Sequence, residues 1–264
     1  MTRLPLSQSE LKKGNILSTD LNTTLFKGGY PRIFEKDLSP PDWYPNYIRT
    51  FVERDVRQLK NVSDLSSFQR FIRICAGRVG QIINFSDLGR DCGIPYHTAK
   101  AWLSILEASF IIFMLPPYYK NFSKRLIKSK KLYFYDTGLA CSLLKIESPE
   151  QIAHHYLRGG LFESYVISEL LKHRFNQGKE SNCSFWRDNQ GHEIDCILEQ
   201  GGKVLPIEIK SGETIDRKFF KSLAYWKELS GLQDEAYLIF GGEEKQTRRE
   251  GQVLGWSSLS EIVA

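Results

Sequence analysis

The chain has 264 residues, a length that favours about two domains with a substantial hydrophobic core. Basic residues exceed acidic ones only modestly, 36 against 31, so composition alone does not identify a polyanion-binding protein. Five cysteines without a C-x-x-C pair exclude a disulfide framework and a typical zinc site, and predict reduced thiols in a cytoplasmic protein. Without a signal-peptide pattern or an apolar run of membrane-spanning length, we expect no membrane partner.

The N-terminal segment, residues 1–27, is polar and is not expected to fold alone, although a short helical pattern covers residues 9–13. The dipeptide Pro40-Pro41 is expected to end the element that precedes it. Apolar residues at helical spacing then predict an amphipathic helix over 44–59. The arginines on its other face form either a solvated surface or a contact for phosphates or a partner domain. They are Arg49, Arg54 and Arg57.

A helix-turn-helix pattern follows a second predicted helix over 65–80. A short helix over 84–92, a break at Gly93-Ile94-Pro95 and a longer helix over 96–108 make this pattern. The N-terminal residues of the second helix would face DNA, and predicted strands over 111–115 and 132–135 would form a wing. Helix-turn-helix pairs also occur in proteins that bind no DNA, so this alternative stays open. The residues expected to face DNA are Tyr96, His97 and Lys100.

The segment between the two predicted wing strands is basic. Residues 108–135 contain no acidic side chain, and aromatic residues are interleaved with the cations. This composition suits a phosphate backbone, because each contact releases counterions, and double-stranded DNA is the expected partner. A flexible loop that is merely soluble is the alternative. The cations expected to contact DNA are Lys120, Lys124, Arg125, Lys128, Lys130 and Lys131.

A boundary is expected at Ser148-Pro149, after which residues 149–173 have a helical pattern. Glu163 interrupts the apolar face of this helix, and a carboxylate in such a place needs a partner. It would act as a third acid beside the following strands, pair with Lys210, or lie at the edge of the apolar stripe. A helix over 218–229 and a strand over 236–240 complete an α/β arrangement.

A β-meander over 184–210 contains the strongest chemical signal. Its predicted strands cover 184–188, 192–199 and 203–210, and Gly201-Gly202 forms a two-residue hairpin loop. That loop places Asp195 opposite Glu208, with Cβ atoms about 5 Å apart. Such carboxylates repel each other unless a divalent cation lies between them. Lys210 lies on the same face as Glu208; an ordinary surface ion pair is the alternative, which the apolar neighbours disfavour.

The succession of Glu163 on a helix, Asp195 on one strand and Glu208 with Lys210 on the next resembles the PD-(D/E)XK superfamily, which has the restriction-endonuclease-like fold. More of the chain resembles the C-terminal half of a prokaryotic AAA-type ATPase family, in which a winged helix precedes a nuclease-like domain. The motifs that carry this wider resemblance are G-G-Y-P at Gly28, V-E-R-D-V-R at Val52, Y-D-T-G-L at Tyr135, G-x-x-F-E at Gly159, W-R at Trp186 and E-I-D-C-I at Glu193.

The resemblance implies an α/β (α+β) protein in three parts. Residues 1–27 would be the remnant of a preceding ATPase region, 28–148 a helical winged-helix-like domain, and 149–264 a nuclease-like domain with a central mixed sheet. No G-x-x-x-x-G-K-[ST] phosphate loop is present, so no ATP site is expected in this chain. A separate ATPase domain or self-association is an expected interaction.

The implied function is a DNA-binding protein whose nuclease-like domain cleaves phosphodiester bonds with Mg²⁺ or Mn²⁺. Asp195 and Glu208, with Glu163, would hold the metal, and Lys210 would orient the attacking water or stabilise developing charge. Arg187, together with Trp186 and His192, would line the DNA. The alternative is a non-catalytic DNA-binding or regulatory module of an AAA-type ATPase whose nuclease fold is idle.

Overall fold

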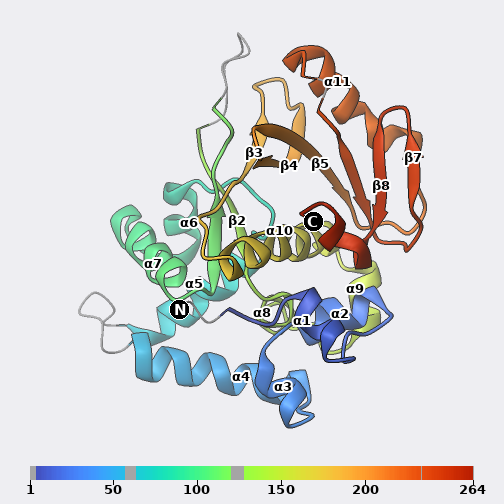
Figure 1. The fold of residues 1–264 in the computed structure, drawn as a ribbon. Helices are drawn as coiled ribbons and strands as arrows, with labels where there is room; N and C mark the ends of the chain where they lie inside the picture. Colours follow the sequence, from blue (N-terminus) through green and yellow to red (C-terminus); the bar gives the residue numbers. More distant parts are fainter. Residues whose placement is uncertain (1–3, 57–63, 120–127, 233, 264) are drawn as a thin grey trace. The chain divides into compact units, whose positions relative to one another are not determined.

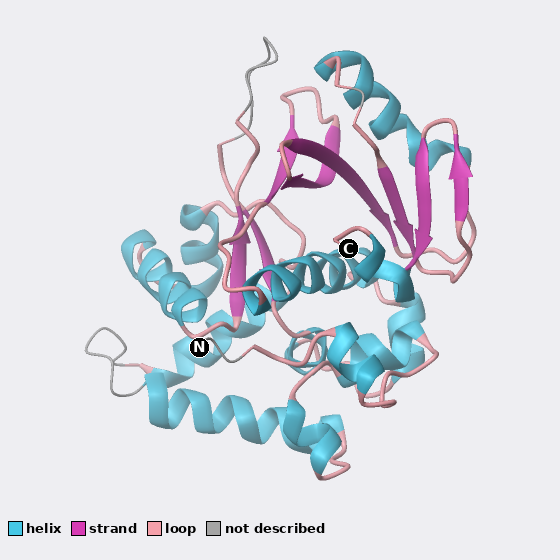
Figure 2. Cartoon of the chain, in the orientation of Figure 1, coloured by secondary structure: helices cyan, strands magenta, loops and turns pink. Residues whose placement is uncertain are grey.

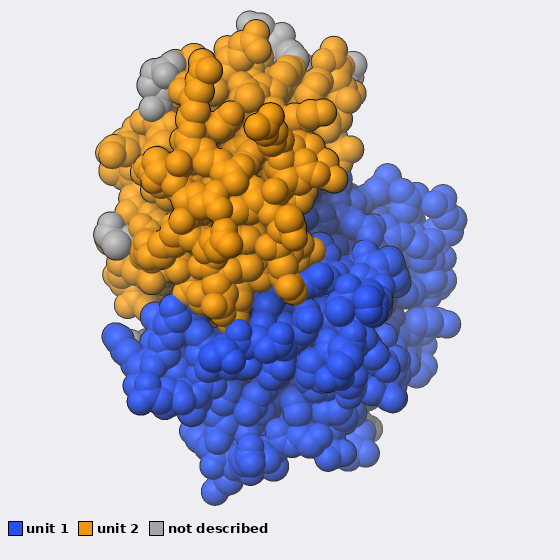
Figure 3. Space-filling view, turned by 90° about the vertical axis from the view of Figure 1, so that its right-hand side faces the viewer, with its two compact units in different colours: residues 1, 3–114, 131–165 blue, residues 2, 115–130, 166–264 orange. Residues whose placement is uncertain are grey.

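The computed structural model describes residues 4–56, 64–119, 128–232 and 234–263. The chain divides into two compact units, which Figure 3 colours separately. Unit 1 holds residues 3–114 and 131–165, and unit 2 holds residues 115–130 and 166–264. This division does not coincide with the expected boundary at 148/149. Helices and a mixed sheet are both present, so the predicted α/β class is confirmed (Figure 2).

The N-terminal residues form part of unit 1. Helix α1 (Gln8–Lys13) begins at Ser7, whose backbone N–H donates to the Glu10 carboxylate at 2.8 Å in a capping box. Helix α2 (Leu21–Lys27) buries Leu21, Leu25 and Phe26. Helix α2 packs on two helices further along unit 1, α8 (Thr137–Leu143) and α9 (Pro149–His154), so these apolar side chains lie in the core of unit 1.

The helix predicted from residue 44 in unit 1 begins four residues earlier, at a proline. After α3 (Pro31–Glu35), helix α4 (Pro40–Thr50) starts at Pro40, because the first helical position needs no N–H and the ring already fixes a helical φ. The chain continues as a π-helix over Phe51–Val56. The rest of the predicted helix over 44–59 lies outside the described residues.

Two of the family-like motifs meet at a buried aspartate. Asp136 is 2% exposed and caps α8 (Thr137–Leu143) by accepting the Leu139 N–H at 2.7 Å. It also accepts the Gly29 N–H and the Tyr44 hydroxyl, each at 2.7 Å. The G-G-Y-P and Y-D-T-G-L segments are thus joined by hydrogen bonds to one carboxylate, which gives both a structural role in unit 1.

We expect Asp136→Ala to destabilise the protein by about 3 kcal/mol, because it removes a helix cap and leaves buried donors without an acceptor. Urea unfolding followed by circular dichroism measures this loss. The matched control is Asp42→Ala, since Asp42 is an exposed acid in the first turn of α4. Equal stabilities for the two variants would contradict the role assigned to Asp136.

The predicted helix pair is present in unit 1. Helix α5 (Leu65–Ala76) precedes α6 (Phe85–Cys92) and α7 (Tyr96–Ala108). Gly93 ends α6 with φ at +69°, a left-handed conformation that favours glycine. Strands β1 (Ile112–Leu115) and β2 (Lys131–Phe134) form a two-stranded sheet, and Ile82 makes an antiparallel bridge to Lys131. The buried face of α7 is the predicted one, with Ala99, Trp102, Leu103 and Leu106.

The continuous helix predicted over 149–173 is two helices. Helix α9 covers Pro149–His154 and α10 covers Arg158–Asn176. The backbone of His155 is extended, with φ at −74° and ψ at 133°, which interrupts the helical hydrogen bonds. Among the described residues, none of the helices combines the length and the apolar composition that a membrane span needs.

Unit 2 is built on a six-stranded mixed sheet in the order β3-β4-β5-β6-β8-β7. Strands β3 to β5 are antiparallel neighbours, whereas β6 is parallel to β5, and β8 to β6. The sequence did not predict β7 and β8: β7 has three residues, and β8 begins and ends with glycine. The strands are β3 (Cys183–Arg187), β4 (Glu193–Gln200), β5 (Lys203–Lys210), β6 (Tyr237–Phe240), β7 (Gln246–Arg248) and β8 (Gly251–Gly255).

Helix α11 (Lys221–Ser230) follows a short 3-10 helix over Arg217–Phe220 and packs on β4 and β5 (Figure 1). A second 3-10 helix, Trp256–Glu261, follows β8. The core beneath α11 is aromatic. The ring centroids of Trp186 and Trp226 are 5.3 Å apart, and the planes of the two rings make an angle of 72°. Trp186 is 1% exposed, so the expectation that it lines a DNA surface is wrong.

The register of the central hairpin is the predicted one. Gln200 pairs with Lys203, and the pairing continues to Cys196 and Ile207. Gly201 and Gly202 have φ at +60° and +80°, the left-handed conformations that a two-residue hairpin loop requires. One further step along both strands places Asp195 opposite Glu208.

Candidate functional site

Three side chains of unit 2 converge where β4 begins and the antiparallel β5 ends. The Lys210 ammonium lies 2.6 Å from Glu208 Oε1 and 3.1 Å from Asp195 Oδ2. It also donates to the Ile209 carbonyl oxygen at 3.2 Å. The Ile209 N–H donates to Asp195 Oδ2 at 2.8 Å, so this carboxylate holds the neighbouring strand just beyond the last backbone pair of the hairpin, Cys196 with Ile207. The predicted convergence of Asp195, Glu208 and Lys210 is therefore present.

Both carboxylates are buried, and one ammonium serves both. Asp195 is 7% exposed and Glu208 is 4% exposed. Burial first, and repulsion from Asp195 second, raise the pKa of the Glu208 carboxyl to about 8. Burial alone would lower the pKa of Lys210, but the attraction of Asp195 and Glu208 outweighs it and raises that pKa. With both carboxylates ionised, the site would hold more negative charge than its single cation offsets, so Glu208 keeps its proton up to about pH 8.

The oxygen atoms around Lys210 fit a hard divalent cation. Two carboxylates and the Ile209 carbonyl are the ligand types that Mg²⁺ and Mn²⁺ prefer. Glu208 Oε2 is buried and has no hydrogen-bond partner among the described residues, so it is available as a ligand. Within the described residues, no group of three or more His, Cys, Asp or Glu side chains has a metal-binding arrangement. The candidate site is therefore a two-carboxylate site completed by a backbone carbonyl.

The helix acid Glu163 belongs to unit 1, where it has partners of its own. Its Oε2 accepts the Tyr133 hydroxyl at 2.8 Å and lies 3.7 Å from Lys131 Nζ. Gly160, on the same helix, allows a close approach to the backbone of Val79, whose oxygen would lie 2.5 Å from an added Cβ. The structure thus gives Glu163 and the nearby glycine roles in the packing of unit 1.

The predicted DNA-contacting residues differ in accessibility. At the start of α7, Tyr96 is 50% exposed, and His97 and Lys100 are also exposed. Lys128 and Lys130 of unit 2 are exposed. The remaining predicted cations of this loop lie outside the described residues. They are Lys120, Lys124 and Arg125.

Two of the predicted DNA contacts are occupied by ion pairs. Lys131 is only 4% exposed because it begins β2, and its ammonium lies near Glu163, so the prediction that it contacts DNA is wrong. Arg187 is partly exposed and lies 3.1 Å from the carboxylate of Glu193, its partner in the β3–β4 register. Contact between Arg187 and phosphate would compete with this pair.

Ser222, in the first turn of α11, also contacts the site: its hydroxyl donates to Glu208 Oε1 at 3.4 Å. No motif identifies this serine. Only its position on the helix could have indicated it: the apolar Leu223 and Trp226 show which face of α11 meets the sheet, and Ser222 lies next to that face.

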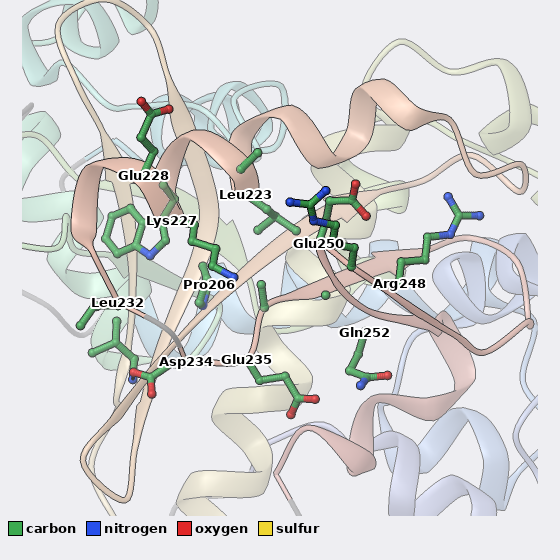
Figure 4. A pocket seen from close by; sticks show the side chains of 16 residues that line it. Pro206, Leu223, Lys227, Glu228, Leu232, Asp234, Glu235, Arg248, Glu250 and Gln252 are labelled. Atoms are coloured by element: carbon green, nitrogen blue, oxygen red, sulfur yellow. Dashed lines mark hydrogen bonds between the residues drawn. The ribbon is translucent and has the colours of Figure 1, made fainter.

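A cavity of about 680 Å³ lies in unit 2, away from the carboxylate pair. Figure 4 shows acids and bases around it, including Lys227, Glu235 and Arg248. The residues Pro206, Ala236 and Gln252 place it near the beginnings of β5, β6 and β8, whereas Glu208 and Lys210 lie at the end of β5. Ligands of open α/β sheets bind beyond the carboxyl ends of the strands. The carboxylate pair is therefore the stronger candidate site.

A family model described as a domain of unknown function, DUF8612, matches residues 18–150, just over half of the chain. The chain belongs to the DUF8612 family. A second model, for the domain of unknown function DUF4143, matches residues 158–259, which include Asp195, Glu208 and Lys210. The DUF8612 match therefore covers the helix pair, and the DUF4143 match covers the sheet.

The DUF8612 chain also resembles two uncharacterized mycobacterial proteins. One is from Mycobacterium bovis (strain ATCC BAA-935 / AF2122/97) and the other from Mycobacterium tuberculosis (strain ATCC 25618 / H37Rv). Each is 28% identical over 190 residues, which cover 71% of this chain and 42% of the relative. The chain thus spans less than half the length of these curated relatives. No solved structure matches it.

Proposed function

We propose that this chain is a DNA-binding protein whose unit 2 is a PD-(D/E)XK nuclease that cleaves phosphodiester bonds with Mg²⁺ or Mn²⁺. The observation that carries the proposal is the convergence of Asp195, Glu208 and Lys210 at the end of β5. Buried carboxylates that face each other are costly to a fold, so their presence favours a functional use. The order of α10, the β3–β5 meander, α11 and β6 also agrees with the predicted nuclease-like domain.

Each residue of the site has a distinct task under this proposal. Asp195, Glu208 and the Ile209 carbonyl would hold the metal. A metal bound there would supply a water of lowered pKa and a positive charge beside the scissile phosphate. Lys210 would exchange its present carboxylate contacts for the attacking water or for the negative charge that develops at phosphorus. Ser222 would hold Glu208 in its orientation through the hydroxyl contact.

Helices α6 and α7 of unit 1 support the proposed DNA binding. The order of α5, the Ile82 bridge, α6, α7, β1 and β2 is consistent with a winged helix. Tyr96, His97 and Lys100 are exposed at the start of α7, where a recognition helix presents its base-reading residues. Exposed Lys128 and Lys130, with the cations predicted between 120 and 125, would add phosphate contacts.

The experiment that tests the proposal is nicking of supercoiled plasmid by the purified chain. We expect nicking with Mg²⁺ or Mn²⁺, none with EDTA, and a loss of at least about 100-fold in Asp195→Asn, because one metal ligand is weakened. Lys203→Ala is the matched control, since Lys203 is an exposed lysine at the other end of β5. Undiminished nicking by Asp195→Asn would refute the assigned site.

A second candidate is a DNA-binding or regulatory module of an AAA-type ATPase with an idle nuclease fold. The observation that favours it is that Lys210 already contacts both carboxylates. Under this candidate, no nicking occurs with any divalent cation, and salt-dependent duplex binding is the same for Asp195→Asn and the wild type. Binding assays and nicking assays on the same preparations separate the two candidates.

A further inference from the structure

A histidine on unit 2 is held by a buried carboxylate. His192 Nδ1 lies 3.0 Å from Asp188 Oδ2, and Asp188 is fully buried. Asp188 Oδ1 also accepts the backbone N–H groups of Gln190 and His192, at 2.9 and 3.0 Å. The aspartate therefore fixes both the β3–β4 turn and the imidazole ring.

The His192 ring is also fixed from one side by Tyr225 of α11. The two rings stack with centroids 4.0 Å apart and an interplanar angle of 15°. The Tyr225 hydroxyl lies 3.3 Å from Asp188 Oδ2. The His192 side chain is nevertheless 43% exposed, and its Nε2 makes no hydrogen bond with any described residue. Nδ1 is thus held by Asp188, whereas Nε2 is available to a ligand.

The fixed histidine and the carboxylate pair share one face of α11. Ser222 contacts Glu208, and Tyr225, three residues later, contacts His192. Residues three apart on a helix are neighbours, with Cβ atoms about 5–6 Å apart. The exposed Lys221 lies four residues before Tyr225 and adds a cation to the same side of the helix.

We propose that His192 is a phosphate-contacting residue beside the Asp195–Glu208 pair, and that its Nε2 donates a hydrogen bond to a phosphodiester oxygen of bound DNA. The contact between Nδ1 and Asp188 fixes the ring with Nε2 on its exposed side. In the complex, Asp188 and the phosphate would accept the two N–H groups of the imidazolium. This inference rests on the proposed function for the identity of the ligand. Asp188 and Tyr225 are positioning residues, because they act through the imidazole.

A purely structural role is the competing explanation, since Asp188 also fastens the turn between β3 and β4. The two explanations differ in what DNA does to the ring. If phosphate binds at Nε2, the NMR signals of the His192 ring change when DNA is added. If His192 only stabilises the turn between β3 and β4, these signals stay the same.

The test combines NMR and binding on the full chain with a short DNA duplex in EDTA, which prevents metal-dependent cleavage. We expect the His192 ring signals to shift saturably, and His192→Gln to bind the duplex about tenfold more weakly, the loss of roughly one charge-assisted hydrogen bond. His173→Gln is the matched control, because His173 is in unit 2 and its ring contacts Gln177 at 2.7 Å. Equal thermal stability of the two variants would show that the loss is not unfolding.

The outcomes separate this inference from the proposed nuclease activity. Shifted His192 signals and weakened binding, in a protein that nicks no plasmid with Mg²⁺, uphold the phosphate contact and refute the nuclease. Metal-dependent nicking with unchanged His192 signals and unchanged His192→Gln affinity overturns the contact and leaves the nuclease. A wild-type chain that binds no duplex overturns both.

Discussion

Replacing Lys210 with alanine is expected to abolish plasmid nicking and, at the same time, to strengthen divalent-metal binding. The lysine ammonium contacts oxygen atoms of Asp195, Glu208 and the Ile209 carbonyl, and these groups would supply the ligands of the metal. Its removal frees these oxygens. The expected loss of cleavage is about 100- to 1,000-fold, the usual effect of removing one group that stabilises transition-state charge.

The same substitution is expected to destabilise the metal-free protein by about 3 kcal/mol, because two buried carboxylates lose their shared cation. Addition of Mg²⁺ should restore much of this loss, so the metal-induced rise in Tm should be larger for Lys210→Ala than for the wild type. Lys203→Ala again serves as the control. Plasmid nicking by the Lys210→Ala variant, or a Tm of this variant that does not rise with Mg²⁺, would contradict the assigned roles.

The free energy of unfolding in EDTA is expected to fall by up to about 5 kcal/mol between pH 4.5 and 8 through Glu208 alone. Burial and the facing Asp195 raise the pKa of this carboxyl from 4.5 to about 8 in the folded protein. Between these values the folded state keeps a proton that the unfolded state releases. The stabilising contribution is therefore complete below pH 4.5 and is lost as the pH rises through 8.

Glu208→Gln isolates this effect because glutamine does not titrate. Urea unfolding across this pH range should show the variant gaining stability relative to the wild type as the pH rises. Glu199→Gln, at an exposed position of β4, is the control and should run parallel to the wild type. A constant difference between Glu208→Gln and the wild type would show that Glu208 is not held protonated by its surroundings.

The part of the site that sequence reasoning predicted is the part that local geometry determines. Gly201 and Gly202 accept the conformations of a two-residue loop, and the alternation of a strand then fixes Asp195, Glu208 and Lys210 on one face. These relations need only the hairpin itself.

The residues that were misplaced depend on contacts distant in sequence. Lys131 looks like its exposed neighbours Lys128 and Lys130, yet the bridge to Ile82 and the nearby Glu163 bury it. The pairing of His192 with Asp188 and Tyr225 requires both the conformation of the β3–β4 turn and the position of α11. Neither follows from the spacing of residues along the chain.

The most direct measurement of the central claim is a crystal structure of the chain soaked with Mn²⁺, paired with calorimetric titration of Mn²⁺. We predict an anomalous peak between the carboxylates of Asp195 and Glu208, with Lys210 turned away, and loss of the binding heat in Asp195→Asn. No peak between these two carboxylates, together with a binding heat that Asp195→Asn leaves unchanged, would contradict the account.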